Sequence, residues 1–261
     1  MFDNLRRAEQ ARKRKNGGRE NNAATPEESA GSESAAPAQP AGKPSGNGAG
    51  DLPEEFTREL GILRNSLQST ALDSPLRTLL FTSASHEEGV TTLAASYARL
   101  SALGSQERVL LIELNARRPA LFWRLGLASE SGVTHLFEEN RPLSSIVQRD
   151  SRLGFDVVHV GEKDPTKLQL HLEEGLPRLL AEATAGYTTV VIDAPPVVLS
   201  PETPQIARRV DGVVMVVHCG KTRREIVQRS IKMIEQFEGS VLGVVLNRKK
   251  YYIPDFIYQR V

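Results

Sequence analysis

From residue 52 onward the chain alternates between short apolar runs and segments with helical spacing, and this alternation constrains the fold most. The runs are continuously apolar, which is typical of strands covered on both faces. Because strands and helices take turns along the chain, we predict an α/β fold with a doubly wound, mostly parallel sheet and helices on both faces. The expected strands are residues 77–83, 108–113, 155–160, 188–193, 211–217 and 241–247, and the expected helices are 54–69, 91–103, 176–185, 202–209 and 223–237.

The first fifty residues differ in composition from the rest. Residues 1–16 carry six basic and two acidic side chains, so this end is either a solvated, partly helical segment or a contact for an anionic membrane surface or a partner protein. Residues 17–50 are rich in Gly, Ala, Ser, Pro, Asn and Glu, which cannot bury enough apolar surface to offset the entropy of ordering. We therefore expect a disordered tail over 1–50, an α/β domain over 51–250 and an aromatic tail over 251–261.

Composition excludes several classes of protein. A formal charge of +1 gives no reason to expect nucleic acid as a partner. The single Cys219 excludes an internal disulfide, and no apolar run reaches the roughly 18 residues of a membrane span. No signal peptide is apparent, so we expect a cytoplasmic protein, with peripheral contact at the inner face of the membrane as an option. The five histidines are dispersed without metal-ligand spacing and are expected to be ordinary surface or core residues: His86, His135, His159, His171 and His218.

Residues 84–92 lie between the first expected strand and the helix after it, which is the setting of a phosphate-binding loop. There, backbone N–H groups and a helix N-terminus attract phosphate, and the Lys of G-x-x-x-x-G-K-[ST] reaches the β and γ oxygens. Counted back from Gly89, the first glycine of the pattern is replaced by Ala84, and a second small residue by Glu87. Val90 stands where the lysine belongs. The sequence thus predicts the scaffold of a nucleotide site that lacks its main cation.

Two further strand ends carry carboxylates. One strand ends at Glu113, followed by Asn115, and another ends at Asp193, followed by Pro195 and Pro196. A carboxylate at this end of a parallel sheet can hold the water shell of Mg²⁺ or activate a nucleophile. Glu113 and Asp193 are therefore the candidate catalytic residues.

Four segments carry a resemblance to a known family: LLIELNARRPAL, VVIDAPPVV, RRVDGVVMVVHCGKTRR and VLGVVLN. The chain resembles, over about residues 54–250, the bacterial tyrosine kinases of capsule and exopolysaccharide synthesis, which are P-loop proteins related to Min-type and chromosome-partitioning ATPases. The resemblance implies ATP and Mg²⁺ as cofactors. It also implies site residues: nucleotide contacts at Gly89, Val90, Thr91, Thr92 and Asn247, Mg²⁺ contacts at Thr91 and Asp193, and phosphorylation at Tyr251, Tyr252 and Tyr258.

The chain departs from the family where phosphate is handled. The family loop PGEGKST has Gly where Glu87 stands and Lys where Val90 stands, so the charge offered to a triphosphate is more negative by two. The paired aspartates of the family become Glu113 and Asn115, and an Asp after the third strand becomes Glu202. Since charged hydrogen bonds to phosphate contribute roughly 1.5–3 kcal/mol each, these changes predict weak or no ATP binding and phosphotransfer.

The family's self-assembly motif E-x-x-R-x-x-R is also incomplete. It aligns with Arg58, Gly61 and Arg64, so only the last arginine is kept, which argues against ring-like assembly and leaves self-association open. The C-terminal tyrosines are sparse, so anchoring of the tail on the domain or a partner competes with phosphorylation as their role.

Three functions follow from these observations. The first is a degenerate kinase-like protein, not itself an enzyme, that regulates exopolysaccharide or capsule synthesis and export by docking on the cytosolic segment of a membrane-anchored chain-length co-polymerase. The second is an active protein-tyrosine autokinase that controls polysaccharide chain length. The third is a partitioning-type ATPase, disfavoured because the loop has no lysine. Docking is expected at the turn formed by Arg117, Arg118 and Pro119 and at the aromatic tail.

Overall fold

The computed structural model describes residues 53–70, 75–103, 107–127, 131–162 and 164–249, and the two expected tails, 1–50 and 251–261, lie outside these ranges. The described part contains a seven-stranded sheet in the order β3-β4-β2-β5-β1-β6-β7. Every neighbouring pair is parallel except β3 and β4, so the predicted α/β class with a mostly parallel sheet is confirmed. The strands are β1 (Thr78–Ser83), β2 (Val109–Glu113), β3 (Gln148–Arg149), β4 (Asp156–Val158), β5 (Thr189–Asp193), β6 (Gly212–His218) and β7 (Val241–Asn247).

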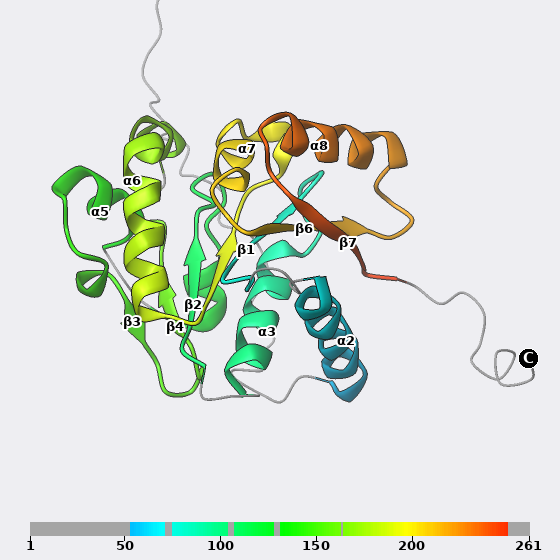
Figure 1. Ribbon diagram of the computed structural model, residues 1–261, viewed down its shortest axis with the longest axis horizontal. Helices are drawn as coiled ribbons and strands as arrows, with labels where there is room; N and C mark the ends of the chain where they lie inside the picture. The colour runs from blue at the N-terminus through cyan, green and yellow to red at the C-terminus, as the bar shows by residue number, and fades with distance from the viewer. Residues whose placement is uncertain (1–52, 71–74, 104–106, 128–130, 163, 250–261) are drawn as a thin grey trace, which may run out of the picture. The chain divides into compact units, whose positions relative to one another are not determined.

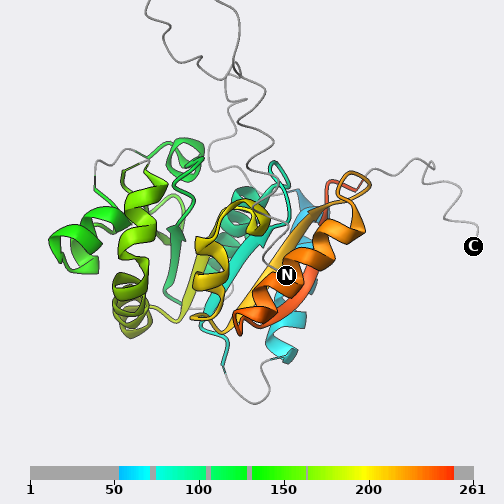
Figure 2. The same ribbon diagram turned by 90° about the horizontal axis from the view of Figure 1, so that it is seen from above.

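Helices cover both faces of the sheet (Figures 1 and 2). Buried side chains of α5 to α8 form one apolar core with the sheet, and those of α2 to α4 form a second core on the other face. In Figure 2, α6, α7 and α8 lie side by side across the sheet. The helices are α2 (Glu54–Thr70), α3 (Val90–Leu103), α4 (Leu121–Leu125), α5 (Val133–Glu139), α6 (Pro165–Gly186), α7 (Glu202–Ala207) and α8 (Arg224–Gln236), with 3-10 turns η1 (Leu143–Ser145) and η2 (Val197–Leu199).

The prediction for α6 was wrong at its start, because the helix begins at Pro165 and not near residue 176. Asp164 caps it by accepting a hydrogen bond from the Thr166 N–H at 2.8 Å, and proline suits the first helical position. Gly175, inside this helix, is a packing position. A Cβ there would lie 2.3 Å from Cδ1 of Phe137, so glycine lets α5 approach α6.

The expectation that all strands are covered on both faces was wrong for β7. This strand pairs only with β6 and lies at the edge of the sheet, so Val244 is 44% exposed and Leu246 is 61% exposed. The short elements β3, α4 and α5 were not predicted, since they are too brief to show a period in the sequence.

No helix among the described residues has both the length and the apolar character needed to cross a membrane.

Candidate nucleotide site

The predicted site residues come together at the carboxyl ends of β1, β2 and β5. In the parallel register, Asp193 pairs with Phe81 of β1 on one side and with Glu113 of β2 on the other. Residues 84–89 connect β1 to the start of α3, so the loop, Glu113 and Asp193 share one edge of the sheet. This is the edge at which open α/β sheets bind ligands.

The loop is held by the carboxylate of Glu88, a residue for which the sequence pattern predicts no role. Its Oε2 accepts hydrogen bonds from the N–H groups of Ala84 (3.0 Å) and Ser85 (3.1 Å), and its Oε1 accepts one from the Thr222 hydroxyl. Glu88 is 1% exposed, so these are buried, charge-assisted bonds. The Glu88 side chain therefore braces the loop from within and ties it to the segment between β6 and α8.

Gly89 is required by both its backbone and its surroundings. Its φ is +91°, and a Cβ on it would lie 2.3 Å from the side-chain nitrogen of Asn247. The same nitrogen of Asn247 donates a hydrogen bond to the Glu88 carbonyl at 2.8 Å. Asn247, proposed from the resemblance as a nucleotide contact, thus clamps the loop to the end of β7 in this structure.

The side chain of Glu87, which replaces a small residue of the family loop, is exposed and points away from the interior of the loop. Its φ of 63° places it in the left-handed region, which costs a residue with a Cβ about 1–2 kcal/mol and glycine little. A glycine at this position, as in the family loop, would adopt the left-handed conformation at little cost.

We expect Glu87→Gly to raise the free energy of unfolding by about 0.5–1 kcal/mol, because it relieves this backbone strain at some cost in unfolded-state entropy. Urea denaturation measures the change. Glu87→Ala keeps the Cβ and should leave stability almost unchanged, so an equal gain for both variants would contradict the backbone explanation.

Asp193 is fully buried, and neither of its carboxyl oxygens has a hydrogen bond of good geometry with the described residues. Burial raises the pKa of Asp193 to about 7; the Glu113 carboxylate adds to the rise, while the Thr91 hydroxyl and the Arg124 guanidinium oppose it. A buried carboxylate with free lone pairs beside a hydroxyl is a suitable partner for a hydrated cation. Gly89, Thr91 and Asp193 thus fit a Mg²⁺–phosphate group, and Val90 does not.

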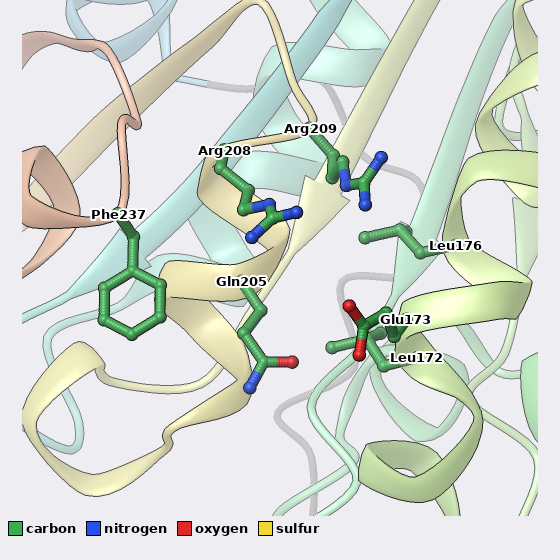
Figure 3. A pocket seen from close by; sticks show the side chains of 7 residues that line it. All are labelled: Leu172, Glu173, Leu176, Gln205, Arg208, Arg209 and Phe237. Carbon is green, nitrogen blue, oxygen red and sulfur yellow. The ribbon is translucent and has the colours of Figure 1, made fainter.

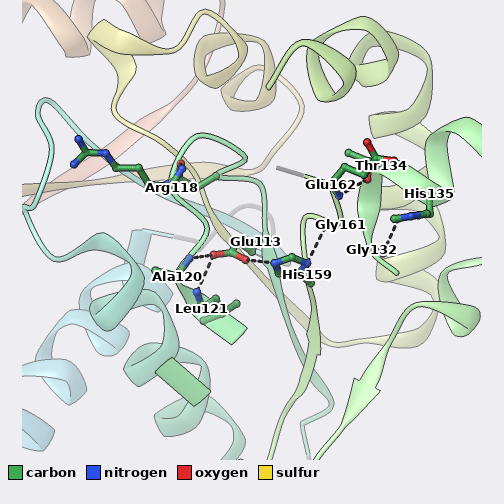
Figure 4. Close-up of polar contacts among 11 residues, drawn as sticks. Glu113, Arg118, Ala120, Leu121, Gly132, Thr134, His135, His159, Gly161 and Glu162 are labelled. Atoms are coloured by element: carbon green, nitrogen blue, oxygen red, sulfur yellow. Dashed lines mark hydrogen bonds and ion pairs between the residues drawn. The ribbon is translucent and has the colours of Figure 1, made fainter. Parts of the chain in front are cut away.

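Both carboxyl oxygens of Glu113 contact other groups of the protein (Figure 4). Its Oε1 accepts hydrogen bonds from the N–H groups of Ala120 (2.7 Å) and Leu121 (2.8 Å), which open α4, and its Oε2 lies 3.4 Å from Nε2 of His159. Nδ1 of His159 accepts the Gly161 N–H at 3.0 Å, which leaves Nε2 as the nitrogen that carries the proton toward Glu113. His159, expected to be an ordinary core residue, therefore belongs to the surroundings of the site.

The turn between β2 and α4 lies over the same edge. Nε of Arg117 is 3.5 Å from Oε1 of the buried Glu202, and Oδ1 of Asn115 accepts the Arg118 N–H at 3.1 Å. Burial, Arg118 and Arg117 all lower the pKa of His86 in the loop, while Glu87 raises it. Asn115 and Glu202, which both differ from the family pattern, thus order the turn that carries Arg117 and Arg118 beside the loop.

Other predicted residues lie elsewhere. Arg64, the arginine kept from the assembly motif, forms an ion pair of 3.5 Å with Glu107. Tyr251, Tyr252 and Tyr258 lie outside the described residues.

A second recess lies among α6, α7 and the end of α8, beside the amino ends of β6 and β7 (Figure 3). Arg208 and Arg209 extend toward Glu173 and Leu176 of α6 in this view. The recess contains none of the predicted site residues, so the candidate site stays at the loop.

Among the described residues, no group of three or more His, Cys, Asp or Glu side chains is placed to hold a metal ion. Mg²⁺ commonly takes several ligands from phosphate and water, so Thr91 and Asp193 could hold it without further carboxylates.

Comparison with known proteins agrees with the resemblance read from the sequence. No family model matches the chain. The tyrosine-protein kinase YwqD of Bacillus subtilis (strain 168) is 27% identical over 188 residues, which are 72% of this chain and 79% of that protein. The tyrosine-protein kinase etk of Escherichia coli (strain K12) is 25% identical over 185 residues, 71% of this chain and only 25% of that protein. The chain thus spans a quarter of the second relative.

Solved structures give the same result. The kinase domain of VpsO superimposes with a TM-score of 0.66 and 27% identity, covering 75% of this chain and 97% of that domain. The relatives of the chain are therefore bacterial tyrosine kinases, its structural neighbours are their kinase domains, and its fold is that of P-loop nucleotide-binding proteins.

Proposed function

We propose that this relative of bacterial tyrosine kinases acts as a regulator or scaffold in exopolysaccharide or capsule synthesis and export, with weak or no ATP-dependent phosphotransfer. One observation carries the proposal. Gly89 has a φ of +91° at the end of the loop that leads into α3, yet the first residue of α3 is Val90, which offers no charge to a triphosphate.

The proposed partner is the cytosolic segment of a membrane-anchored polysaccharide co-polymerase, met at the inner face of the membrane. The sequence resemblance supports this choice. The exposed Arg117 and Arg118, ordered beside the loop by Glu202 and Asn115, offer a charged contact surface at the edge where such a partner would sense the site.

The test is a deletion strain complemented with the wild-type gene or with Asp193→Ala. If the protein acts by its presence, polysaccharide production should be lost in the deletion strain and restored equally by both genes at equal protein level. Asp150→Ala, which removes a carboxylate paired with Arg152 outside the candidate site, is the matched control. Loss of production with Asp193→Ala alone, at normal protein level, would refute the scaffold function.

An active protein-tyrosine autokinase is the second candidate. It is favoured by Asp193, whose free carboxyl oxygens lie beside the Thr91 hydroxyl at the start of α3. Phosphotyrosine formed by the purified full chain with ATP and Mg²⁺, and absent from Asp193→Ala, would establish this alternative.

A further inference from the structure

A nucleotide at this loop would need a cation from outside it. A triphosphate with Mg²⁺ retains net negative charge, and Val90 cannot balance it. The Glu88 carboxylate lies within the loop and makes a nearby cation more necessary. The question is whether another element brings a positive charge to the start of α3.

Arg124 of α4 brings a positive charge to the start of α3. Its Nη1 donates a hydrogen bond of 3.5 Å to the hydroxyl of Thr92, the third residue of α3, so the guanidinium stands at the first turn of this helix. It is also close enough to Asp193 to oppose the rise of the aspartate pKa. The guanidinium thus lies next to the hydroxyls and the carboxylate that would surround a phosphate.

The position of Arg124 is fixed by the site itself. Oε1 of Glu113 accepts the N–H groups of Ala120 and Leu121, at the residues where α4 begins. Gly126 ends the helix in the left-handed conformation two residues after Arg124. The carboxylate predicted to be catalytic therefore anchors the short helix that presents the arginine.

Arg124 is also available. Within the described part of the chain it forms no ion pair, whereas Arg117 is paired with Glu202. Nε of Arg248 lies 4.0 Å from the point where a Cβ on Gly89 would be, on the side of the loop held by Asn247, and is the competing candidate.

An independent observation indicates that the start of α3 receives a ligand. Asp193 is 0% exposed and both of its oxygens lack a hydrogen-bond partner among the described residues, although Thr91 is its neighbour. A buried carboxylate left in this state is costly unless a cation or a donor joins it.

We propose that Arg124 supplies the positive charge that Val90 does not, so that the site binds a nucleoside triphosphate with Mg²⁺ through a cation relocated from the loop to α4. This inference rests on the proposed function in that both place a nucleotide-type site at this loop, and it replaces the weak or absent ATP binding expected from Val90 by binding through Arg124. It concerns binding and leaves phosphotransfer aside.

Calorimetric titration of the full chain with ATP and Mg²⁺ tests the proposal. The wild-type chain should bind, and Arg124→Gln should bind about tenfold or more weakly, as expected for a lost charged hydrogen bond to phosphate. Arg124→Lys should keep most of the affinity. Val90→Lys should restore binding to Arg124→Gln and add little to the wild type, since the two cations serve the same anion.

The matched control is Arg229→Gln, which removes the same charge from the exposed surface of α8 and should leave affinity unchanged. Several results would overturn the proposal: no binding of millimolar ATP by the wild type, equal affinities for Arg124→Gln and the control, or a loss confined to Arg248→Gln. A failure of Val90→Lys to rescue a folded Arg124→Gln variant would do so as well. Phosphotyrosine formation by the wild type would refute the scaffold function and leave this inference standing.

Discussion

Replacing Glu88 with alanine is expected to lower the free energy of unfolding by about 3 kcal/mol. The substitution leaves the N–H groups of Ala84 and Ser85 and the hydroxyl of Thr222 without their acceptor in a buried position. Each unsatisfied buried donor costs about 1–3 kcal/mol, and partial access of water to Ser85 limits the sum. Urea denaturation at pH 7 measures the loss.

The neighbouring Glu87 provides the control for this experiment, because it carries the same charge but is exposed. Glu87→Ala should leave the unfolding free energy almost unchanged. Thr222→Val removes one of the three donors and should cost less than Glu88→Ala. Equal losses for Glu87→Ala and Glu88→Ala would mean that charge, and not the brace, determines the stability of the loop.

Asp193→Asn is expected to stabilise the protein at pH 8 by up to about 4 kcal/mol and to have little effect at pH 4. The pKa of Asp193 rises from its ordinary value of 3.8 to about 7, mainly through burial. Between these two values the unfolded chain has lost the proton and the folded chain still holds it. Stability of the wild type therefore falls as the pH rises through this range, by about 4 kcal/mol, and levels off above it.

Asparagine does not titrate, so the variant should lack this fall. Urea denaturation at several pH values from 4 to 8 measures both profiles. Asp150→Asn is the control: hydrogen bonds from Arg152 lower the pKa of Asp150 to about 2, so its titration lies below the range tested. Parallel profiles for the wild type and Asp193→Asn would contradict the raised pKa.

The sequence was sufficient to predict the α/β architecture and to group the residues of the candidate site at one edge of the sheet. Six of the seven strands could be predicted because buried parallel strands are continuously apolar, and the loop and the ends at Glu113 and Asp193 could be grouped because parallel strands end at one edge. The two-residue β3 and the five-residue α4 could not be predicted, since neither is long enough for a period to show.

Glu88, His159 and Arg124 could not be predicted for a different reason. Glu87 and Glu88 are adjacent residues of the same type, so the sequence does not distinguish them. In the structure Glu87 has a left-handed backbone and an exposed side chain, whereas the side chain of Glu88 is buried within the loop. His159, which directly follows β4, and Arg124 of α4 reach the site through packing that no local sequence pattern reveals. Contacts between distant segments therefore set the details of this site.

The hydrogen bond from Asn247 to the Glu88 carbonyl joins positions 159 residues apart. It comes from the last residue of the last strand, and the remaining chain continues from there. This hydrogen bond therefore joins the loop to the carboxyl end of β7. Any displacement of the end of β7 would therefore reach the loop through this one amide side chain.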